Sequence, residues 1–173
     1  IKDQLEIFFN VKNKFGLGIC NGCQMFSQLH SIIPGTDHWP LFDKNKSNQF
    51  EARLSRVKIN KSKSLLMNGM EGSILPIIVS HGEGRAVFSN KKNTSNAIIS
   101  YVDNNNKKTT EYPFNPNGSD NGSNGFTNSD GRITIMMPHP ERLFTLNQYS
   151  YHPANWKISP WSKIFINARN WLK

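Results

Sequence analysis

GLGICNGCQMF, residues 16–26, joins a short apolar run to a helical pattern and contains both cysteines of the chain. The apolar run ending at Cys20 is typical of a buried strand, and from Asn21 onward the apolar residues recur at helical spacing until Pro34. A strand that leads directly into a helix, with further apolar strands downstream, favours an α/β fold: a sheet with flanking helices and additional antiparallel strands.

Two later segments give more specific expectations about the sheet. The apolar residues of segment 49–59 change phase after Leu54, and this slip predicts a β-bulge near Ser55 and Arg56. Segment 115–131 holds three Asn-Gly pairs and few apolar residues. The sequence therefore predicts an extended surface loop there.

Composition limits the partners and the compartment. The chain has 21 basic and 12 acidic residues, a net charge of +9, and such a surplus can indicate nucleic-acid binding. Its lysines are scattered among asparagines, without interleaved aromatic residues or a basic helix face, so we expect a solvated surface and no nucleic-acid partner. No apolar run approaches the roughly 18 residues of a membrane span, so we expect no membrane partner. Two cysteines in 173 residues favour a reducing, cytoplasmic location.

Cys20 and Cys23 could belong to a metal site, a redox pair or a nucleophilic centre. A structural zinc site needs four Cys or His ligands in closely spaced pairs, but no second cysteine pair exists and the five histidines are dispersed; we expect no metal. A Cys-x-x-Cys pair where a strand meets a helix fits a redox motif, yet that motif does not need the glycines found here. The nucleophile interpretation accounts for more of the residues.

The five residues from Gly18 to Gly22 have the form of a nucleophile elbow, with cysteine in place of serine. We expect both glycines to be required, because side chains there would collide with neighbouring backbone. Cys20 would then lie at the positive end of a helix dipole, and the Asn21 N–H would point to where an oxyanion forms. Cys23, one helical turn later, is expected to pack beside the elbow.

A thiolate nucleophile needs a base, and the base needs a group that orients it. The segment MMPHPER, residues 136–142, supplies His139 and Glu141, which lie on the same side of an extended chain. Prolines at 138 and 140 exclude a helix there. The alternative is a surface histidine beside a solvated carboxylate; next to a cysteine elbow, the catalytic pair is the favoured interpretation.

LGICNGCQ and MMPHPER together resemble the class I, or triad, glutamine amidotransferases. Further stretches resemble the glutaminase domains of the phosphoribosylformylglycinamidine synthase family in its long, single-polypeptide form: HWPLFDKNKSNQFEARLS, SHGEGR, YVDNNN, YPFNPNGS and SYHPANWKISPWSKIFINARNWL. The resemblance covers essentially the whole chain and implies the flavodoxin-like sheet of class I amidotransferases. It also implies that residues 1–173 form one glutaminase domain without its N-terminal strands, because the family has strands and a glycine-rich oxyanion loop before the elbow.

The resemblance implies that Cys20 attacks the side-chain amide of glutamine to form a thioester, with His139 moving protons and Glu141 orienting it. It implies a glutamine-binding role for Gln24, whereas His81 of SHGEGR either lines the glutamine pocket or structures its turn. Released ammonia would pass to a synthetase domain of the same polypeptide. There ATP and Mg²⁺ would support conversion of formylglycinamide ribonucleotide to formylglycinamidine ribonucleotide in de novo purine synthesis; no cofactor is implied in this chain.

Three other functions stay open at this point. The chain could be a class I glutaminase that serves a different synthetase, or a catalytically silent docking module of the same fold. A basic nucleic-acid-binding module is the third, and steep salt dependence would be its signature. If the glutaminase interpretation holds, the isolated chain should be inactive, because one of two oxyanion donors would come from a loop that it does not contain.

Overall fold

The computed structural model describes residues 1–90 and 92–173 in full, and Lys91 only as a member of a short helix. In these described residues, six strands form one sheet in the order β1-β8-β7-β6-β3-β4, and two more pair separately. Within the large sheet, β1 and β8 run parallel and the other neighbours run antiparallel. The strands are β1 (Gly16–Ile19), β2 (Leu41–Asp43), β3 (Glu51–Ile59), β4 (Ile74–His81), β5 (Arg85–Val87), β6 (Ile99–Tyr101), β7 (Ser123–Thr127) and β8 (Ile133–Met136).

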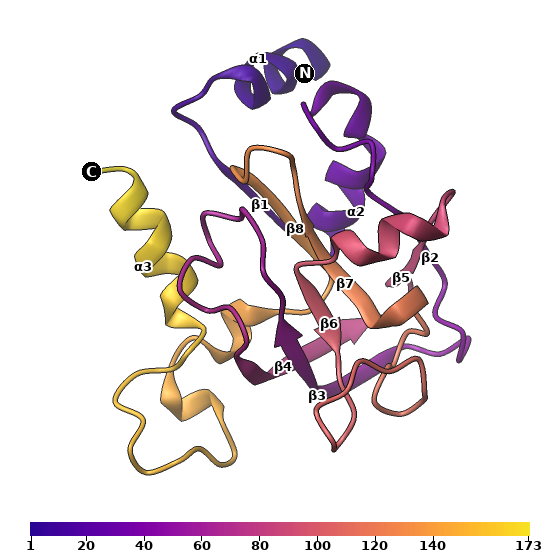
Figure 1. Ribbon diagram of the computed structural model, residues 1–173, viewed down its shortest axis with the longest axis vertical. Helices are drawn as coiled ribbons and strands as arrows, with labels where there is room; N and C mark the ends of the chain where they lie inside the picture. Colours follow the sequence, from indigo (N-terminus) through magenta and orange to yellow (C-terminus); the bar gives the residue numbers. More distant parts are fainter.

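Helices flank this sheet on both sides, so the α/β class expected from the sequence is confirmed. Figure 1 shows α3 on one side of the β1–β8 pair and α2 on the other. Short 3₁₀ helices occupy several of the connections. The helices are α1 (Lys2–Asn10), α2 (Asn21–Gln28) and α3 (Ser162–Trp171), and the 3₁₀ helices are η1 (His30–Ile32), η2 (Lys91–Asn96), η3 (Asp120–Gly122), η4 (Pro140–Leu143) and η5 (Leu146–Gln148).

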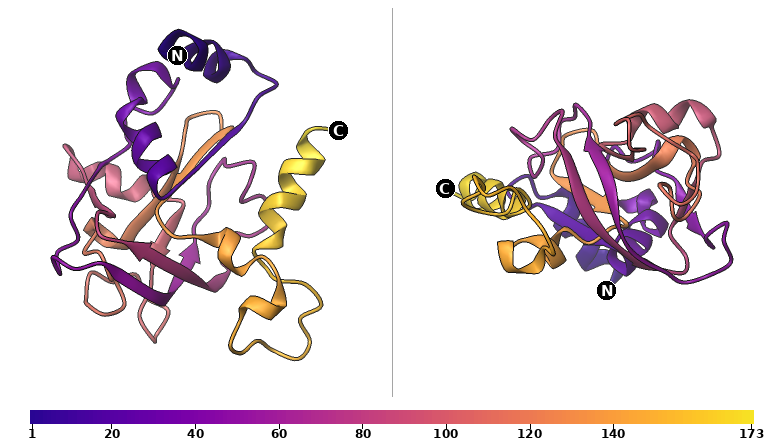
Figure 2. Two further views of the ribbon diagram at one scale, coloured as in Figure 1. Left: turned by 180° about the vertical axis from the view of Figure 1, so that it is seen from behind. Right: turned by 90° about the horizontal axis from the view of Figure 1, so that it is seen from below.

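The large sheet curls so that the chain beyond β8 returns to the free edge of β4. The N–H of His139 donates to the Ile78 carbonyl oxygen at 2.8 Å, and the two residues form an isolated antiparallel bridge. Figure 2 shows η4, directly after this bridge, beside β4. The curl therefore brings the last residue of β4, His81, toward the ends of β1 and β8.

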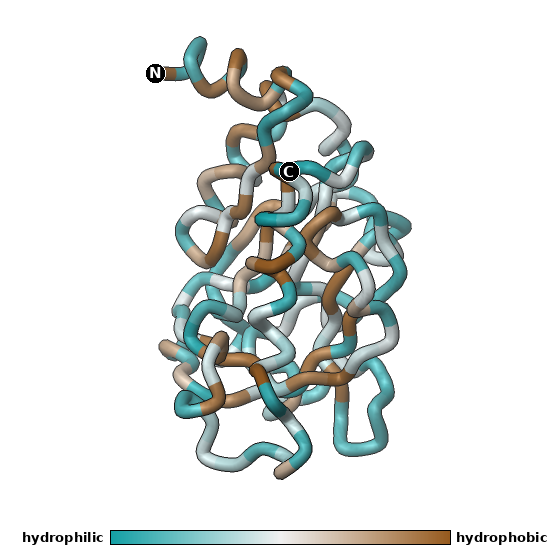
Figure 3. The backbone as a smooth tube through the Cα atoms, turned by 90° about the vertical axis from the view of Figure 1, so that its left-hand side faces the viewer, coloured by the Kyte–Doolittle hydropathy of each residue, from teal (hydrophilic) through white to brown (hydrophobic). Residues whose placement is uncertain are grey.

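The two faces of the sheet bury separate apolar clusters. One cluster lies between the curled sheet, the segment before β4 and α3; its largest members are Ile59, Leu66, Ile77, Ile99, Tyr101, Met136 and Trp161. The other lies under α1 and α2 and includes Phe9, Cys23, Ile33, Phe126, Ile133, Ile135 and Met137. The loops that project from the lower end of Figure 3 are mostly hydrophilic. Burial on both faces explains why β1 and β8 are almost continuously apolar.

The predicted β-bulge in β3 is wrong. β3 and β4 pair in unbroken register from Glu51 opposite His81 to Lys58 opposite Ile74. The change of phase has another cause: Leu54 is on the outer face and 57% exposed, as is Phe50 at 66%, just before the strand. Polar residues occupy the inward-facing positions at the start of the strand. The pattern of hydrophobic residues therefore does not indicate which side chains face the core there.

The prediction of a surface loop at 115–131 is also wrong. This segment contains β7, which pairs with β6 on one side and β8 on the other and is buried along its whole length. Asn115, Asn117 and Ser119, which precede it, are at most 1% exposed. Their side chains are buried because they hydrogen-bond to backbone groups, which offsets the cost of removing amides and hydroxyls from water.

Candidate active site

Cys20 lies on a sharp turn between β1 and α2. Its backbone has φ 52° and ψ −108°. A residue with a side chain adopts this positive φ only at a cost in backbone strain. Backbone hydrogen bonds hold it on both sides: the Cys20 N–H donates to the Met136 carbonyl at 3.0 Å, and the Cys20 carbonyl accepts from Gln24 N–H at 3.0 Å. The geometry is that of a nucleophile elbow, with the thiol half-buried at the sheet edge.

The two elbow glycines are not equivalent. A Cβ built on Gly18 would lie 2.6 Å from the Gly22 carbonyl oxygen, and that oxygen belongs to backbone which cannot move aside cheaply. A Cβ built on Gly22 would meet nothing within 4 Å. The expectation that both glycines are sterically required therefore holds for Gly18 and is wrong for Gly22 within this chain.

This difference predicts unequal effects of two matched substitutions on stability. Gly18→Ala should lower the free energy of unfolding by about 2–4 kcal/mol, because overpacking against backbone forces the elbow to shift. Gly22→Ala should leave it within about 1 kcal/mol, since alanine is the better helix former and has room. Calorimetry on the two variants measures the contrast; equal destabilisation would contradict the elbow geometry described here.

His139 directly precedes η4, and Glu141 lies in the first turn of that helix, after Pro140. The expectation that the prolines exclude a helix here is therefore wrong, because a proline fits the first position of a helix. His139 Nδ1 donates to Glu141 Oε1 at 2.6 Å. The Cys20 side chain is close enough to the imidazole to influence its pKa, and its thiol hydrogen-bonds to the Ser80 carbonyl oxygen at 3.8 Å. His139 Nε2 has no hydrogen-bond partner in the described residues. The structure thus brings together the thiol, imidazole and carboxylate named from the sequence.

These contacts set the protonation of the pair. The nearby Cys20 side chain and the Glu141 hydrogen bond outweigh the effect of burial and raise the pKa of His139 to about 9. Burial of the Glu141 carboxyl would raise its pKa, but the His139 hydrogen bond and charge hold that pKa below its usual value. At neutral pH the imidazole therefore carries a proton and the carboxylate carries a negative charge.

A hollow of about 390 Å³ opens beside the thiol. Its lining residues are Cys20, Asn21, Gln24, Phe50, Ser80, His81, Gly82 and Glu83. Asn21 begins α2, so its backbone N–H is one of the helix-terminal donors that have no partner within the helix. Gln24 Nε2 donates to the Glu83 carbonyl at 2.6 Å. Both predicted substrate residues, Gln24 and His81, therefore line the same hollow as Cys20.

His81 is the buried polar wall of this hollow. It is 4% exposed, and neither ring nitrogen has a hydrogen-bond partner in the described residues. Burial, and then the charge of His139, lower the pKa of His81 to about 4, so its imidazole is neutral at pH 7. The ring lies against Gly84, where an added Cβ would stand 2.2 Å from it. The position of His81 fits a contact with a ligand as well as a role in shaping the turn.

Sequence reasoning missed two buried asparagines behind this turn. Asn45 and Asn117 hydrogen-bond to the backbone of residues 81–84 from segments that are far away in the chain. The sequence signal was indirect: Asn45 and Asn117 both lie in stretches that carried the family resemblance, HWPLFDKNKSNQFEARLS and YPFNPNGS, but neither residue had an assigned role. Cys23 is fully buried against the second apolar cluster, and burial raises the pKa of its thiol well above the usual value.

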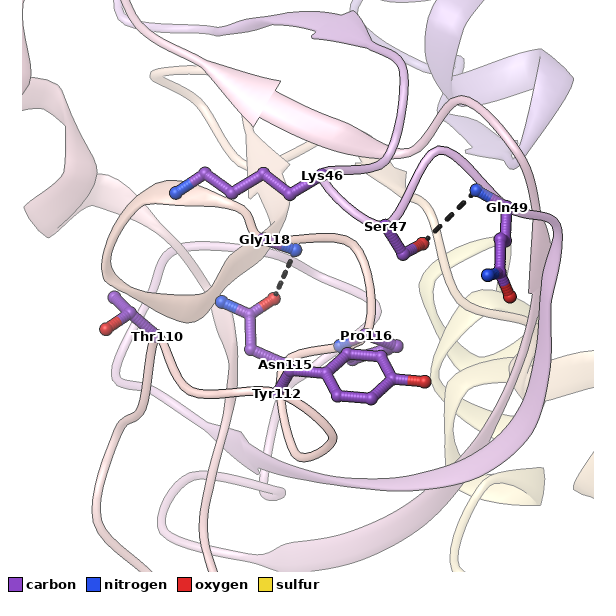
Figure 4. Close-up of a pocket in the computed structure, with 8 residues that line it drawn as sticks. All are labelled: Lys46, Ser47, Gln49, Thr110, Tyr112, Asn115, Pro116 and Gly118. Atoms are coloured by element: carbon purple, nitrogen blue, oxygen red, sulfur yellow. Dashed lines mark hydrogen bonds between the residues drawn. The ribbon is translucent and has the colours of Figure 1, made fainter.

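A second hollow of about 390 Å³ has none of the residues that line the hollow beside Cys20. Figure 4 shows its lining, which comes from the turn at Lys46, Ser47 and Gln49 and from the loop of residues 110–118. It contains neither a cysteine nor a histidine. This hollow therefore lacks the groups of a nucleophilic site.

The described residues contain neither a cluster that could bind a metal ion nor a helix that could span a membrane. No group of three or more His, Cys, Asp or Glu residues there could hold a metal ion. No helix in the same residues is long and apolar enough to cross a membrane.

Comparisons with known proteins show the family and support the fold. The family model for the CobB/CobQ-like glutamine amidotransferase domain matches residues 1–172. The chain is similar to the structure of PurLQS from Thermotoga maritima, with 25% sequence identity and a TM-score of 0.66, covering 91% of this chain and 61% of that one. It also shares its fold with a Thermoplasma acidophilum protein described as a GMP synthase subunit, at 13% identity and a TM-score of 0.56, covering 99% of this chain and 63% of that one. The chain thus spans less than two thirds of either structure.

Proposed function

The chain belongs to the CobB/CobQ-like glutamine amidotransferase domain family, and on that premise we propose that it hydrolyses glutamine to glutamate and ammonia through a thioester on Cys20. The observation that carries this proposal is the meeting of the Cys20 elbow with the hydrogen-bonded pair of His139 and Glu141. The elbow and the pair come from two segments that lie far apart in the sequence.

The proposed reaction uses each group in turn. The deprotonated sulfur of Cys20, whose proton is held by His139, attacks the amide carbon of the glutamine side chain, and the carbonyl oxygen becomes an oxyanion near the Asn21 N–H. His139, which is protonated at neutral pH, gives its proton to the departing nitrogen, so that ammonia leaves and a thioester remains. A water molecule, deprotonated by the now neutral His139, then attacks the thioester and releases glutamate. Glu141 stabilises the imidazolium throughout.

The turn after β4 is suited to hold the amino-acid end of glutamine. Carbonyl oxygens at 81, 82 and 83 are bound to Asn45 and Gln24. Because a trans peptide points its C=O and N–H in opposite directions, the N–H groups of Gly82 and Glu83 face away from Asn45. Neither donates a hydrogen bond to another described residue, and both residues line the hollow with Cys20. Two free N–H groups can bind a carboxylate.

We further propose that the ammonia serves phosphoribosylformylglycinamidine synthesis. The support is the sequence resemblance along the chain and the 25% identity to PurLQS. A synthetase unit, on the same polypeptide, would bind ATP and Mg²⁺ to activate the amide oxygen of formylglycinamide ribonucleotide. Ammonia would reach it internally from the hollow beside Cys20. The residues of this chain supply none of the ATP chemistry in the proposal.

The test traces the amide nitrogen of glutamine into the product. The complete enzyme is given glutamine labelled with ¹⁵N in its amide, ATP, Mg²⁺ and formylglycinamide ribonucleotide. We expect glutamate and ¹⁵N-labelled formylglycinamidine ribonucleotide in equal amounts. Glutamate formation without transfer to this acceptor, but with transfer to another, would indicate a different synthetase. No glutamate in any mixture would sink the glutaminase proposal and favour a silent docking module.

A further inference from the structure

Asn45 binds three backbone groups at the end of β4 and in the turn that follows it. Its side-chain Nδ2 donates to the His81 carbonyl at 2.8 Å, and its Oδ1 accepts from the Gly84 N–H at 3.1 Å. Its backbone N–H donates to the Gly82 carbonyl at 2.9 Å. Asn45 is 1% exposed, so these bonds form away from competing water. Asn45 thus satisfies backbone groups of this turn that a neighbouring strand would otherwise have to satisfy.

Asn117 holds the end of the same turn. Its Nδ2 donates to the Gly84 carbonyl at 2.7 Å, and the side chain is fully buried. Its Oδ1 accepts from both the N–H and the hydroxyl of Ser119, at 3.0 Å and 2.7 Å. The Asn117 carbonyl accepts from the Lys46 N–H at 3.1 Å, which joins the NPNGS loop to the segment that begins with Asn45.

The loop that carries Asn117 is itself fixed in place. Asn115 Oδ1 accepts from the Gly118 N–H at 3.0 Å, the bond drawn in Figure 4. Gly118 has φ +75°, and an added Cβ would stand 2.5 Å from the Lys46 side chain that crosses it. Both facts explain a glycine at this place. Because these contacts hold the loop in place, they also fix the Asn117 side chain that binds the Gly84 carbonyl.

We propose that Asn45 and Asn117 are positioning residues for glutamine binding, an inference that rests on the proposed glutaminase function. Asn45 fixes the carbonyl side of the peptides whose opposite side presents the Gly82 and Glu83 N–H groups to the hollow with Cys20. Asn117 fixes the end of the same turn through the Gly84 carbonyl. Neither asparagine lines that hollow, so each acts only through the turn. The NPNGS stretch thereby gains a role in substrate affinity.

The test separates affinity from chemistry in the complete enzyme. Asn117→Ala removes the donor to the Gly84 carbonyl and leaves that carbonyl buried without a partner, which the turn relieves by moving. We expect the KM for glutamine to rise about tenfold, with kcat at saturating glutamine changed less than about twofold. Alkylation of Cys20 by iodoacetamide should proceed at the wild-type rate, since the elbow and His139 are untouched.

Asn117→Asp is the second variant, in case the alanine variant folds poorly. It keeps an oxygen that can accept from Ser119 and removes the donor to Gly84, so it should raise the KM at least as much. Asn167→Ala is the matched control. Asn167 is a buried asparagine of α3 whose Nδ2 donates to the Leu66 and Asn68 carbonyls at 2.8 Å. It should lose a similar amount of thermal stability with no change in KM.

The outcomes divide cleanly. A KM for glutamine that stays at the Asn167→Ala value in both Asn117 variants would overturn the inference, as would a fall in kcat with KM unchanged. If the wild-type enzyme hydrolyses no glutamine, the proposed function fails and the inference falls with it. Normal wild-type hydrolysis with an unchanged KM in the variants overturns the positioning role alone.

Discussion

Cys20→Ala is expected to abolish glutamine-dependent synthesis in the complete enzyme, with a loss on the order of 10⁴- to 10⁶-fold, because no other group can form the thioester. The half-buried thiol stands at the end of β1 on strained backbone and beside His139. Ammonium chloride should still support synthesis in this variant, since free ammonia bypasses the glutaminase site. Product formation is measured with each nitrogen source.

Cys23→Ala is the matched control for this prediction. The Cys23 thiol is fully buried against the second apolar cluster, and burial raises its pKa, which disfavours the reactive thiolate. We expect glutamine-dependent activity to be retained, with a loss of stability of about 1 kcal/mol from the small cavity. Labelling of Cys23, and not Cys20, by a glutamine-like electrophile would reverse the assignment of the nucleophile.

The elbow and its partner segment could be predicted because the signals are local. Gly18, Cys20 and the following helical pattern lie within a few residues of one another, and so do His139 and Glu141. The spatial meeting of these two segments follows from one parallel pair, β1 with β8, which places their ends at the same edge of the sheet. Short-range patterns were therefore enough for the fold class and for the groups of the candidate site.

The errors occurred where burial depends on contacts across the chain. Hydrophobicity predicted a bulge after Leu54 and a surface loop at 115–131, but polar residues can be buried when backbone groups elsewhere in the chain bond to them. Asn117, in the segment before β7, is such a case, since its partner Gly84 lies 33 residues away. No periodic pattern in the sequence indicates that Asn117 and Gly84 pair. The positioning role inferred for Asn45 and Asn117 is thus visible only in three dimensions.

His139→Ala should lower glutamine hydrolysis by about 10²- to 10⁴-fold, because the proton for the departing nitrogen has no other donor nearby. Glu141→Gln should be the milder change, since it removes the charge that orients and stabilises the imidazolium while leaving the imidazole in place. His30→Ala is the control, because this histidine is exposed and lies beyond the C-terminal end of α2, the end opposite the elbow. Its activity should equal that of the wild type.

The pH profile distinguishes the two roles more sharply than the rates do. His139 with a pKa of about 9 keeps its proton at neutral pH, so wild-type turnover should decline only as the pH rises through about 9. Glu141 is one cause of that raised pKa, and without its charge the pKa of His139 should fall toward the ordinary value. The alkaline decline of Glu141→Gln should therefore begin at lower pH, as measured by kcat against pH. An unshifted decline would show that another group sets it, and wild-type turnover in His139→Ala would refute the triad.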